Sequence, residues 1–177
     1  MSKRAAVLIA TVLSALPGVC RSAAAQDLAI ADQRGLRYHV FLTGAARMTV
    51  LEALRGAGRR LAKPGCRQLF EEFTDRTGRP LTLNLEATAQ SAGDVLAGLY
   101  FVDGDDTIRC RTDRAVVAFT HPGSRVIHVC GRQFLQFAVK TRGGEMLLIH
   151  ELLHALGLGE NPPTSERITD AVINRCG

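Results

Sequence analysis

The chain has no cluster of basic residues, although its formal net charge is +5 over 177 residues. Its lysines and arginines are interleaved with acids along the sequence, whereas a nucleic-acid-binding domain gathers its basic side chains on one face. The sequence also contains no internal repeat, heptad pattern or low-complexity tract. We therefore expect a globular monomer with no nucleic-acid partner.

The chain also has no apolar run long enough to anchor it in a membrane. The N-terminal run, residues 5–16, is shorter than the about 20 residues that a spanning helix needs. It follows Lys3 and Arg4, and it is followed by a Pro-Gly break and then by three alanines. This order predicts a secretory signal peptide, residues 1–25, that is cleaved after Ala25.

Acylation at Cys20, as in a lipoprotein, is the alternative use of this segment, but the bulky Val19 directly before it disfavours acylation. Cleavage after Ala25 leaves residues 26–177, which is one domain of ordinary size. The signal peptide carries three basic residues and no acid, so the formal charge of the mature chain is +2 instead of +5. We expect the mature domain to be secreted or periplasmic, with no stable membrane span.

Cysteines are few and widely spaced, which excludes a zinc knuckle. The cysteines that follow the signal peptide are Cys66, Cys110, Cys130 and Cys176. An even number in an exported chain predicts two disulfides, and four cysteines allow three connectivities. Of these we expect Cys66 to pair with Cys110 and Cys130 to pair with Cys176, so that Cys176 pins a terminal helix.

The spacing of apolar residues predicts several helices. Two are expected at 49–61 and at 66–73. A third is expected from Ser91 to Leu99, with a capping box formed by Ser91 and Asp94. The last is expected after Thr164 or Ser165, with Ile168, Val172 and Ile173 facing inward. The segment Asn161-Pro162-Pro163 before this last helix is expected to be extended and stiff.

Period-two patterns and turn residues predict the strands. Strands are expected at 38–42 and at 81–85, and a hairpin is expected across 115–130 around a Pro-Gly turn. The segment 131–144 is expected to be a loop. The acids at 103–106 suggest calcium, but further oxygen ligands at alternating positions are missing, so a solvated turn is the better interpretation.

The stretch HELLHALGLGE, residues 150–160, places polar side chains on an otherwise apolar helix. Helix positions four apart project from one face, so His150 and His154 can bind one metal ion. Glu151 lies next to that face and can act as a general base on a metal-bound water. Gly157 can adopt a positive φ and return the chain towards the metal, which makes Glu160 the candidate third ligand. The alternative is that Glu160 caps the turn or faces water.

This stretch resembles the metzincin branch of the zincin metallopeptidases, whose motif is H-E-x-x-H-x-x-G-x-x-H, with Asp replacing the last His in some members. His150, Glu151, His154 and Gly157 match it, and Glu160 stands at the third-ligand position. No methionine follows the motif, whereas metzincins have a methionine turn there. Together with the Pro-Pro segment, the short helix and the terminal cysteine, the stretch also resembles small secreted bacterial zincin-like proteins of unassigned activity.

The resemblance implies an α+β zincin-like domain whose active-site helix packs on a small mixed or antiparallel sheet. It implies a zinc peptidase acting on a peptide or protein substrate, with zinc held by His150, His154 and Glu160 and with Glu151 as the base. In the gluzincin variant a later helix supplies the third ligand, which makes Glu166 the second candidate.

The hairpin at 115–130 resembles the last sheet strands of zincins, where an edge strand binds extended substrate through main-chain hydrogen bonds. We expect His121 and His128 on this hairpin, and His39, to be incidental rather than ligands. The alternative function is an exported zinc-binding module of the same fold without peptidase activity. Glu151 favours the enzyme because a structural zinc would not need it, whereas the small size of the domain favours the module.

Overall fold

The computed structural model describes residues 35–140 and 142–177, and the predicted signal peptide lies outside them. The described part contains eight α-helices, one short 3-10 helix and a sheet of four strands in the order β1-β2-β4-β3. The strands β1 (His39–Phe41), β2 (Tyr100–Asp103) and β4 (Val126–Val129) are parallel, and β3 (Ala118–Phe119) is antiparallel to β4. The predicted α+β class with a mixed sheet is therefore confirmed, as are the strand at 38–42 and the hairpin.

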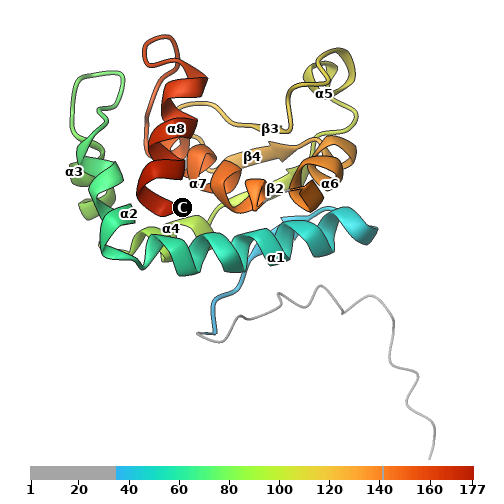
Figure 1. Cartoon of the computed structure of the whole chain (residues 1–177), viewed down its shortest axis with the longest axis horizontal. Helices are drawn as coiled ribbons and strands as arrows, with labels where there is room; N and C mark the ends of the chain where they lie inside the picture. The colour runs from blue at the N-terminus through green and yellow to red at the C-terminus, as the bar shows by residue number, and fades with distance from the viewer. Residues whose placement is uncertain (1–34, 141) are drawn as a thin grey trace, which may run out of the picture.

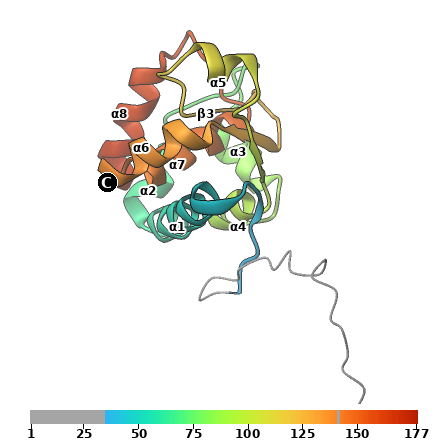
Figure 2. The same ribbon diagram turned by 90° about the vertical axis from the view of Figure 1, so that its right-hand side faces the viewer.

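The first long helix, α1 (Gly44–Leu61), supports the domain from one side. It begins at Gly44, five residues before the predicted start, and it buries the expected apolar stripe. It packs against α4 (Ala92–Ala97), α6 (Gly131–Lys140) and α7 (Gly143–Ala155). Figures 1 and 2 show α1 and α4 together on one side of the molecule, with α5 (Ile108–Thr112) on the opposite side; α8 (Ser165–Cys176) starts on the side of α5 and ends near α1.

The segment 66–73 is helical as predicted, but it is divided between α2 (Pro64–Gln68) and η2 (Leu69–Glu71). The strand predicted at 81–85 is wrong, because this segment forms α3 (Leu81–Glu86). Of its alternating leucines only Leu81 is fully buried, and Leu83 is 44% exposed. Pro80 precedes the first turn, and Leu81, Leu83, Leu85 and Glu86 are good helix formers although Thr82 and Asn84 are not, so the alternating leucines fit a short helix as well as a strand.

The loop predicted at 131–144 is also wrong, because α6 occupies most of it. Gly131, Phe134 and Ala138 face the interior at helical spacing, which the glycines at both ends obscured in the sequence. Gly144 lies in the first turn of α7 against this helix, where an added Cβ would stand 3.2 Å from both the Phe134 and Ala138 side chains. The glycine therefore allows α6 and α7 to pack closely.

All four described cysteines are bonded, but the predicted connectivity is wrong. Cys66 pairs with Cys176 and Cys110 pairs with Cys130, with Cα–Cα distances of 4.5 and 5.4 Å. The reason is tertiary: α8 returns along α2, and α5 lies beside the end of β4. Cys176 does pin the terminal helix, as expected. The two disulfides are compatible with an extracellular location.

The last helix begins at the predicted cap, since Thr164 Oγ1 accepts a hydrogen bond from the Arg167 backbone N–H. Ile168 and Val172 are buried as predicted, but Ile173 is exposed. The segment at 161–163 is not extended, because the Asn161 N–H donates to the Pro163 carbonyl at 2.7 Å and closes a turn. Across residues 35–140 and 142–177, every helix is too short or too polar to cross a membrane.

Candidate metal centre

The helix α7 places His150 and His154 side by side, as predicted. Their Nε2 atoms lie 3.1 Å apart, and the two residues are only 4% and 6% exposed. Leucine and isoleucine side chains between and around them are fully buried and fix the helix in the core. The apolar sequence of α7 thus holds two imidazoles in a nearly dry environment.

Each imidazole has a partner on its Nδ1 atom. His154 Nδ1 lies 2.8 Å from the Leu158 carbonyl oxygen, and an acceptor there requires that this nitrogen carry the proton. His150 Nδ1 lies 3.1 Å from Thr169 Oγ1 on α8. Such partners orient a metal-ligating histidine and leave its Nε2 lone pair free for the metal.

The turn after α7 brings Glu160 to the histidines. Gly157 has a φ of +111°, and its N–H donates to the His154 carbonyl, so the chain reverses directly behind the second histidine. Glu160 Oε1 lies 3.8 Å from His154 Nε2. One ligand atom from each of His150, His154 and Glu160 fits within a span of 4.8 Å, so this group could hold a metal ion.

The turn itself is held by α3. Asn84 Nδ2 donates to the Leu156 carbonyl oxygen and to Asp75 Oδ2, both at 2.9 Å. Hydrogen bonds from Asn84 and then Thr77 keep the pKa of the Asp75 carboxyl well below its usual range. Asp75 is therefore an anion at neutral pH that anchors Asn84 beneath the turn.

The distance between the two imidazoles is compatible with a shared metal ion such as zinc. Two nitrogen ligands at 2.0–2.1 Å in a tetrahedral site are separated by about 3.3 Å, close to the 3.1 Å between the two Nε2 atoms. Burial, followed by the charge of His154, lowers the pKa of His150 to about 3, so its ring is neutral and able to bind a metal. A carboxylate is also an ordinary zinc ligand.

Glu151 is buried beside this group and is not one of its ligands. It is 4% exposed, and its Oε2 atom has no hydrogen-bond partner within the described residues. The carboxyl accepts a hydrogen bond from the Thr120 backbone N–H. Burial, followed by the charge of Glu160, raises the pKa of Glu151 to about 8. A buried carboxyl oxygen without a partner is costly, which points to a ligand or water that it would contact.

These groups open into a cleft of about 550 Å³. Its walls come from the edge strand β3 with its flanking residues, from α7, from the start of α8 and from Arg109 on α5. Figure 1 shows β3 running between α8 and α5. The predicted edge strand therefore lies beside the candidate metal ligands.

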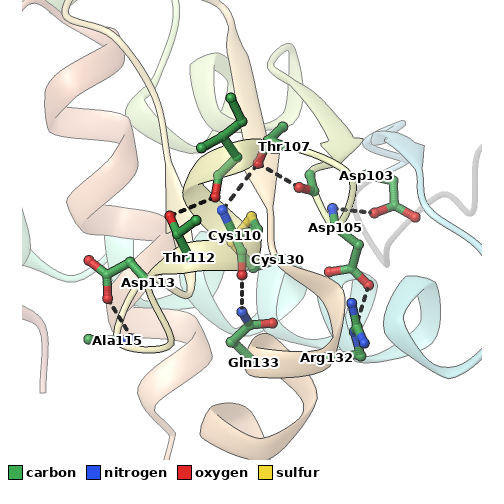
Figure 3. Close-up of a disulfide and its surroundings, with 12 residues drawn as sticks. Asp103, Asp105, Thr107, Cys110, Thr112, Asp113, Ala115, Cys130, Arg132 and Gln133 are labelled. Carbon is green, nitrogen blue, oxygen red and sulfur yellow. Dashed lines mark hydrogen bonds and ion pairs between the residues drawn. A yellow bond between two sulfur atoms is a disulfide. The ribbon is translucent and has the colours of Figure 1, made fainter.

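The other sequence candidates lie elsewhere or serve other roles. Glu166 lines the cleft but does not belong to the ligand group, and His128 stacks on Phe119 with ring centroids 4.9 Å apart. The acids at 103–106 form a turn, in which Asp103 Oδ1 accepts from the Asp105 N–H and Asp105 pairs with Arg132 (Figure 3). The expected turn is therefore present, but it is only partly solvated, since the Asp105 Oδ1 atom is buried and has no hydrogen-bond partner among the described residues.

Sequence analysis missed four residues that shape the site: Thr169, Thr120, Asn84 and Arg109. Thr169 follows Ile168 at the border of the apolar stripe of α8, and Asn84 lies in the segment predicted as a strand. Arg109 is one of several arginines around Cys110. No local pattern marks any of them, because each reaches the site through tertiary packing.

The arrangement combines two imidazoles, a carboxylate able to complete a metal site and a buried carboxyl with one oxygen free. Chemically it could bind a divalent metal ion and move a proton beside it. The cleft is large enough to admit part of an extended chain along β3. Comparison of the chain with family models, with curated proteins and with solved structures found no match.

Proposed function

We propose that this protein is a secreted or periplasmic zinc metallopeptidase. The observation that carries the proposal is the free, buried Oε2 atom of Glu151 beside the group formed by His150, His154 and Glu160. A purely structural zinc site would have no use for this carboxyl, whereas hydrolysis by a metal-activated water requires a base in this place.

Zinc, when bound, would lower the pKa of a water molecule and polarise the substrate carbonyl. His150 and His154 would hold it through their Nε2 atoms, with Glu160 as the third ligand. Glu151, whose ionised form the positive charge of a bound zinc would favour, would accept the proton of the attacking water at its free Oε2 atom and then donate it to the leaving amine. The Thr120 N–H keeps the carboxyl in place during both transfers.

The substrate would lie extended along β3. This strand is the edge of the sheet, and the residues around it line the cleft. Main-chain hydrogen bonds to an edge strand hold a peptide without regard to its sequence. The peptide bond would thereby come next to Glu151, since the Thr120 N–H at the end of β3 contacts that carboxyl.

The test combines metal analysis with hydrolysis of an unbiased peptide library. Wild type and Glu151→Gln should each carry about one zinc per chain, and the variant should hydrolyse peptides about 10²-fold or more slowly. His150→Ala should lose its zinc. Equal activity in wild type and Glu151→Gln would contradict the mechanism, and a zinc-loaded wild type without hydrolysis would favour the non-catalytic module.

A further inference from the structure

We infer that Arg109 binds a carboxylate of the substrate, so that the cleft selects peptides with an acidic group on the α5 side of the cleaved bond. The inference rests on the proposed function and names the substrate class of that same site. The carboxylate can belong to an acidic side chain or to the end of a peptide, because both present the same planar group to a guanidinium.

The position of Arg109 is fixed by an aromatic contact. Its Cζ atom lies 4.9 Å from the centroid of the Phe119 ring, a cation–π distance. Phe119 belongs to β3, the strand along which the substrate would lie, and both residues line the cleft. The guanidinium therefore stands on the wall of the binding cleft and not on a remote surface.

Apart from its contact with the Phe119 ring, the guanidinium has no ion-pair or hydrogen-bond partner in the described part of the chain. Arg60, Arg132 and Arg175 each pair with a carboxylate, but no carboxylate lies within 4.0 Å of Arg109. Asp113, four residues further along, instead accepts a hydrogen bond from the Ala115 N–H at 2.9 Å. The donors of Arg109 thus remain available for a ligand, in the planar arrangement that suits a carboxylate.

The helix that carries Arg109 is rigidly attached. The neighbouring Cys110 is bonded to Cys130 at the end of β4, and the Cys110 carbonyl accepts from Gln133 Nε2 at 2.7 Å (Figure 3). Thr107 caps the helix by accepting from the Cys110 N–H at 3.2 Å. This support fixes the backbone of Arg109 relative to the cleft, so only the side chain has to be ordered when a ligand binds.

The charges around the cleft determine where an anion can lie. Apart from the two histidines, Arg109 is the one basic side chain among the described residues that line the cleft, whereas Asp113, Glu160 and Glu166 are acidic. The positive charge of Arg109 also acts on the Glu151 carboxyl. An anionic substrate group would be repelled near Glu160 and Glu166. Asp113 at the end of α5 is also acidic, but it accepts from the Ala115 N–H, and the neighbouring Arg109 guanidinium can attract an anion on this side of the cleft.

The experiment uses matched peptide pairs on the zinc-loaded protein. Peptides with Asp or Glu scanned through each position are compared with the corresponding Asn or Gln peptides, and free C-termini are compared with amidated ones. Wild type should prefer the carboxylate member by about tenfold or more in kcat/KM, which corresponds to a difference of about 1.4 kcal/mol. A preference for the Asp or Glu peptides would show that the bound carboxylate belongs to a side chain. A preference for free C-termini would show that it belongs to the end of the peptide.

Arg109→Gln should reduce the ratio of kcat/KM between the carboxylate peptide and its uncharged partner towards 1. Arg109→Glu should reverse the preference in favour of peptides with Lys or Arg at the same position. Arg111→Gln is the matched control, since Arg111 lies on the same short helix but does not line the cleft, and it should keep the wild-type ratio. An unchanged ratio in Arg109→Gln, or no preference in an active wild type, would overturn the inference.

A second measurement does not depend on turnover. The same peptide pairs are titrated into Glu151→Gln and into Glu151→Gln with Arg109→Gln, and dissociation constants are measured. Tighter binding of the carboxylate peptide only where Arg109 is present supports the inference even if no peptide is hydrolysed, in which case the proposed function alone fails. Equal binding of both peptides to Glu151→Gln refutes the role of Arg109.

Discussion

The hydroxyl of Thr169 sets the orientation of the first histidine. It lies 3.1 Å from His150 Nδ1, and it comes from α8 rather than from the helix that carries the histidine. Replacing such a partner of a metal-ligating histidine typically costs about 10- to 100-fold in metal affinity. We predict that loss in Thr169→Val, measured by competition with a chromogenic chelator. Thr169→Ser keeps the hydroxyl and should bind zinc like wild type, and equal affinity in both variants would contradict the role.

His150 and Glu151 make the stability of the metal-free protein depend on pH in opposite ways. The pKa of His150 falls from 6.5 to about 3, so lowering the pH through this window protonates the unfolded chain only and destabilises the fold. The pKa of Glu151 rises from 4.5 to about 8, so raising the pH through that window ionises the unfolded chain only and also destabilises the fold. For these two groups, the free energy of unfolding is highest between about pH 4.5 and 6.5.

We predict that Glu151→Gln removes the loss of stability between pH 6.5 and 8 in the metal-free protein. Glutamine cannot ionise, so the folded state no longer retains a proton that the unfolded chain has lost. Glu166→Gln is the control, because it removes an exposed carboxylate from the same cleft. Urea unfolding at a series of pH values measures the slopes. A wild-type slope in Glu151→Gln would show that another group causes the loss.

At the scale of elements, the turn after α7 connects the helix to Glu160, the proposed third ligand. Gly157 has a φ of +111°, and a Cβ added there would stand 3.0 Å from the Asp75 Cβ. We predict that Gly157→Ala lowers the free energy of unfolding by on the order of 1–3 kcal/mol and weakens zinc binding, because it strains the backbone that returns Glu160. Urea unfolding of the metal-free variant and zinc titration measure the two effects.

The next glycine along the turn supplies the control for this prediction. At Gly159 an added Cβ would meet Arg76 Cγ at 3.2 Å, which is part of a flexible side chain. Gly159→Ala should therefore change stability and zinc affinity much less than Gly157→Ala. Equal losses in both variants would mean that the turn tolerates no added side chain at all, and that the positive φ of Gly157 is not the cause.

The elements predicted correctly are those in which one periodicity extends over many residues. The stripe in α1 and the apolar run in α7 gave consistent signals, and the capping box of Ser91 and Asp94 is present at the start of α4. The segment at 81–85 failed because three alternating leucines also fit a short helix. The segment at 131–144 failed because glycines at both ends suggested a loop.

The candidate site likewise contains residues that the sequence predicts and residues that it does not. His150, Glu151 and His154 follow from helix geometry, and Glu160 follows from the turn at Gly157, since all of these lie within eleven consecutive residues. The Leu158 carbonyl that orients His154 lies in the same stretch, but the other orienting groups come from α3, α8 and the end of β3. Their positions depend on how distant segments pack, so no local pattern in the sequence could predict them.

At the scale of the whole molecule, the C-terminal helix is secured by several distant contacts. The buried side chain of Arg60 on α1 pairs with Glu145 on α7 and donates to the Cys176 carbonyl oxygen at 2.8 Å. Arg175 pairs with Glu72, and Cys176 is bonded to Cys66. Because α8 carries Thr169, these contacts also hold the partner of His150 in place. The pairing of the cysteines is therefore a property of the tertiary structure, which their spacing does not determine.

The two disulfides should contribute differently to stability and to the site. In the chain-entropy model the bond between Cys66 and Cys176, separated by 110 residues, contributes about 5 kcal/mol, and the bond between Cys110 and Cys130, separated by 20, contributes about 3 kcal/mol. We predict that replacing the first pair by alanine lowers the free energy of unfolding more, as measured by urea titration of metal-free protein at one pH.

The same two variants should also differ in zinc affinity and in peptide preference, because each bond supports a different wall of the cleft. Loss of the bond between Cys66 and Cys176 frees the end of α8, so zinc affinity should fall as Thr169 loses its position near His150. Loss of the bond between Cys110 and Cys130 frees α5, so the preference for carboxylate peptides should fall while zinc affinity is largely kept. Zinc titration and the matched peptide pairs, applied to both variants, measure these effects. Equal changes in both variants would show that the bonds stabilise the domain as a whole without a separate effect on either wall.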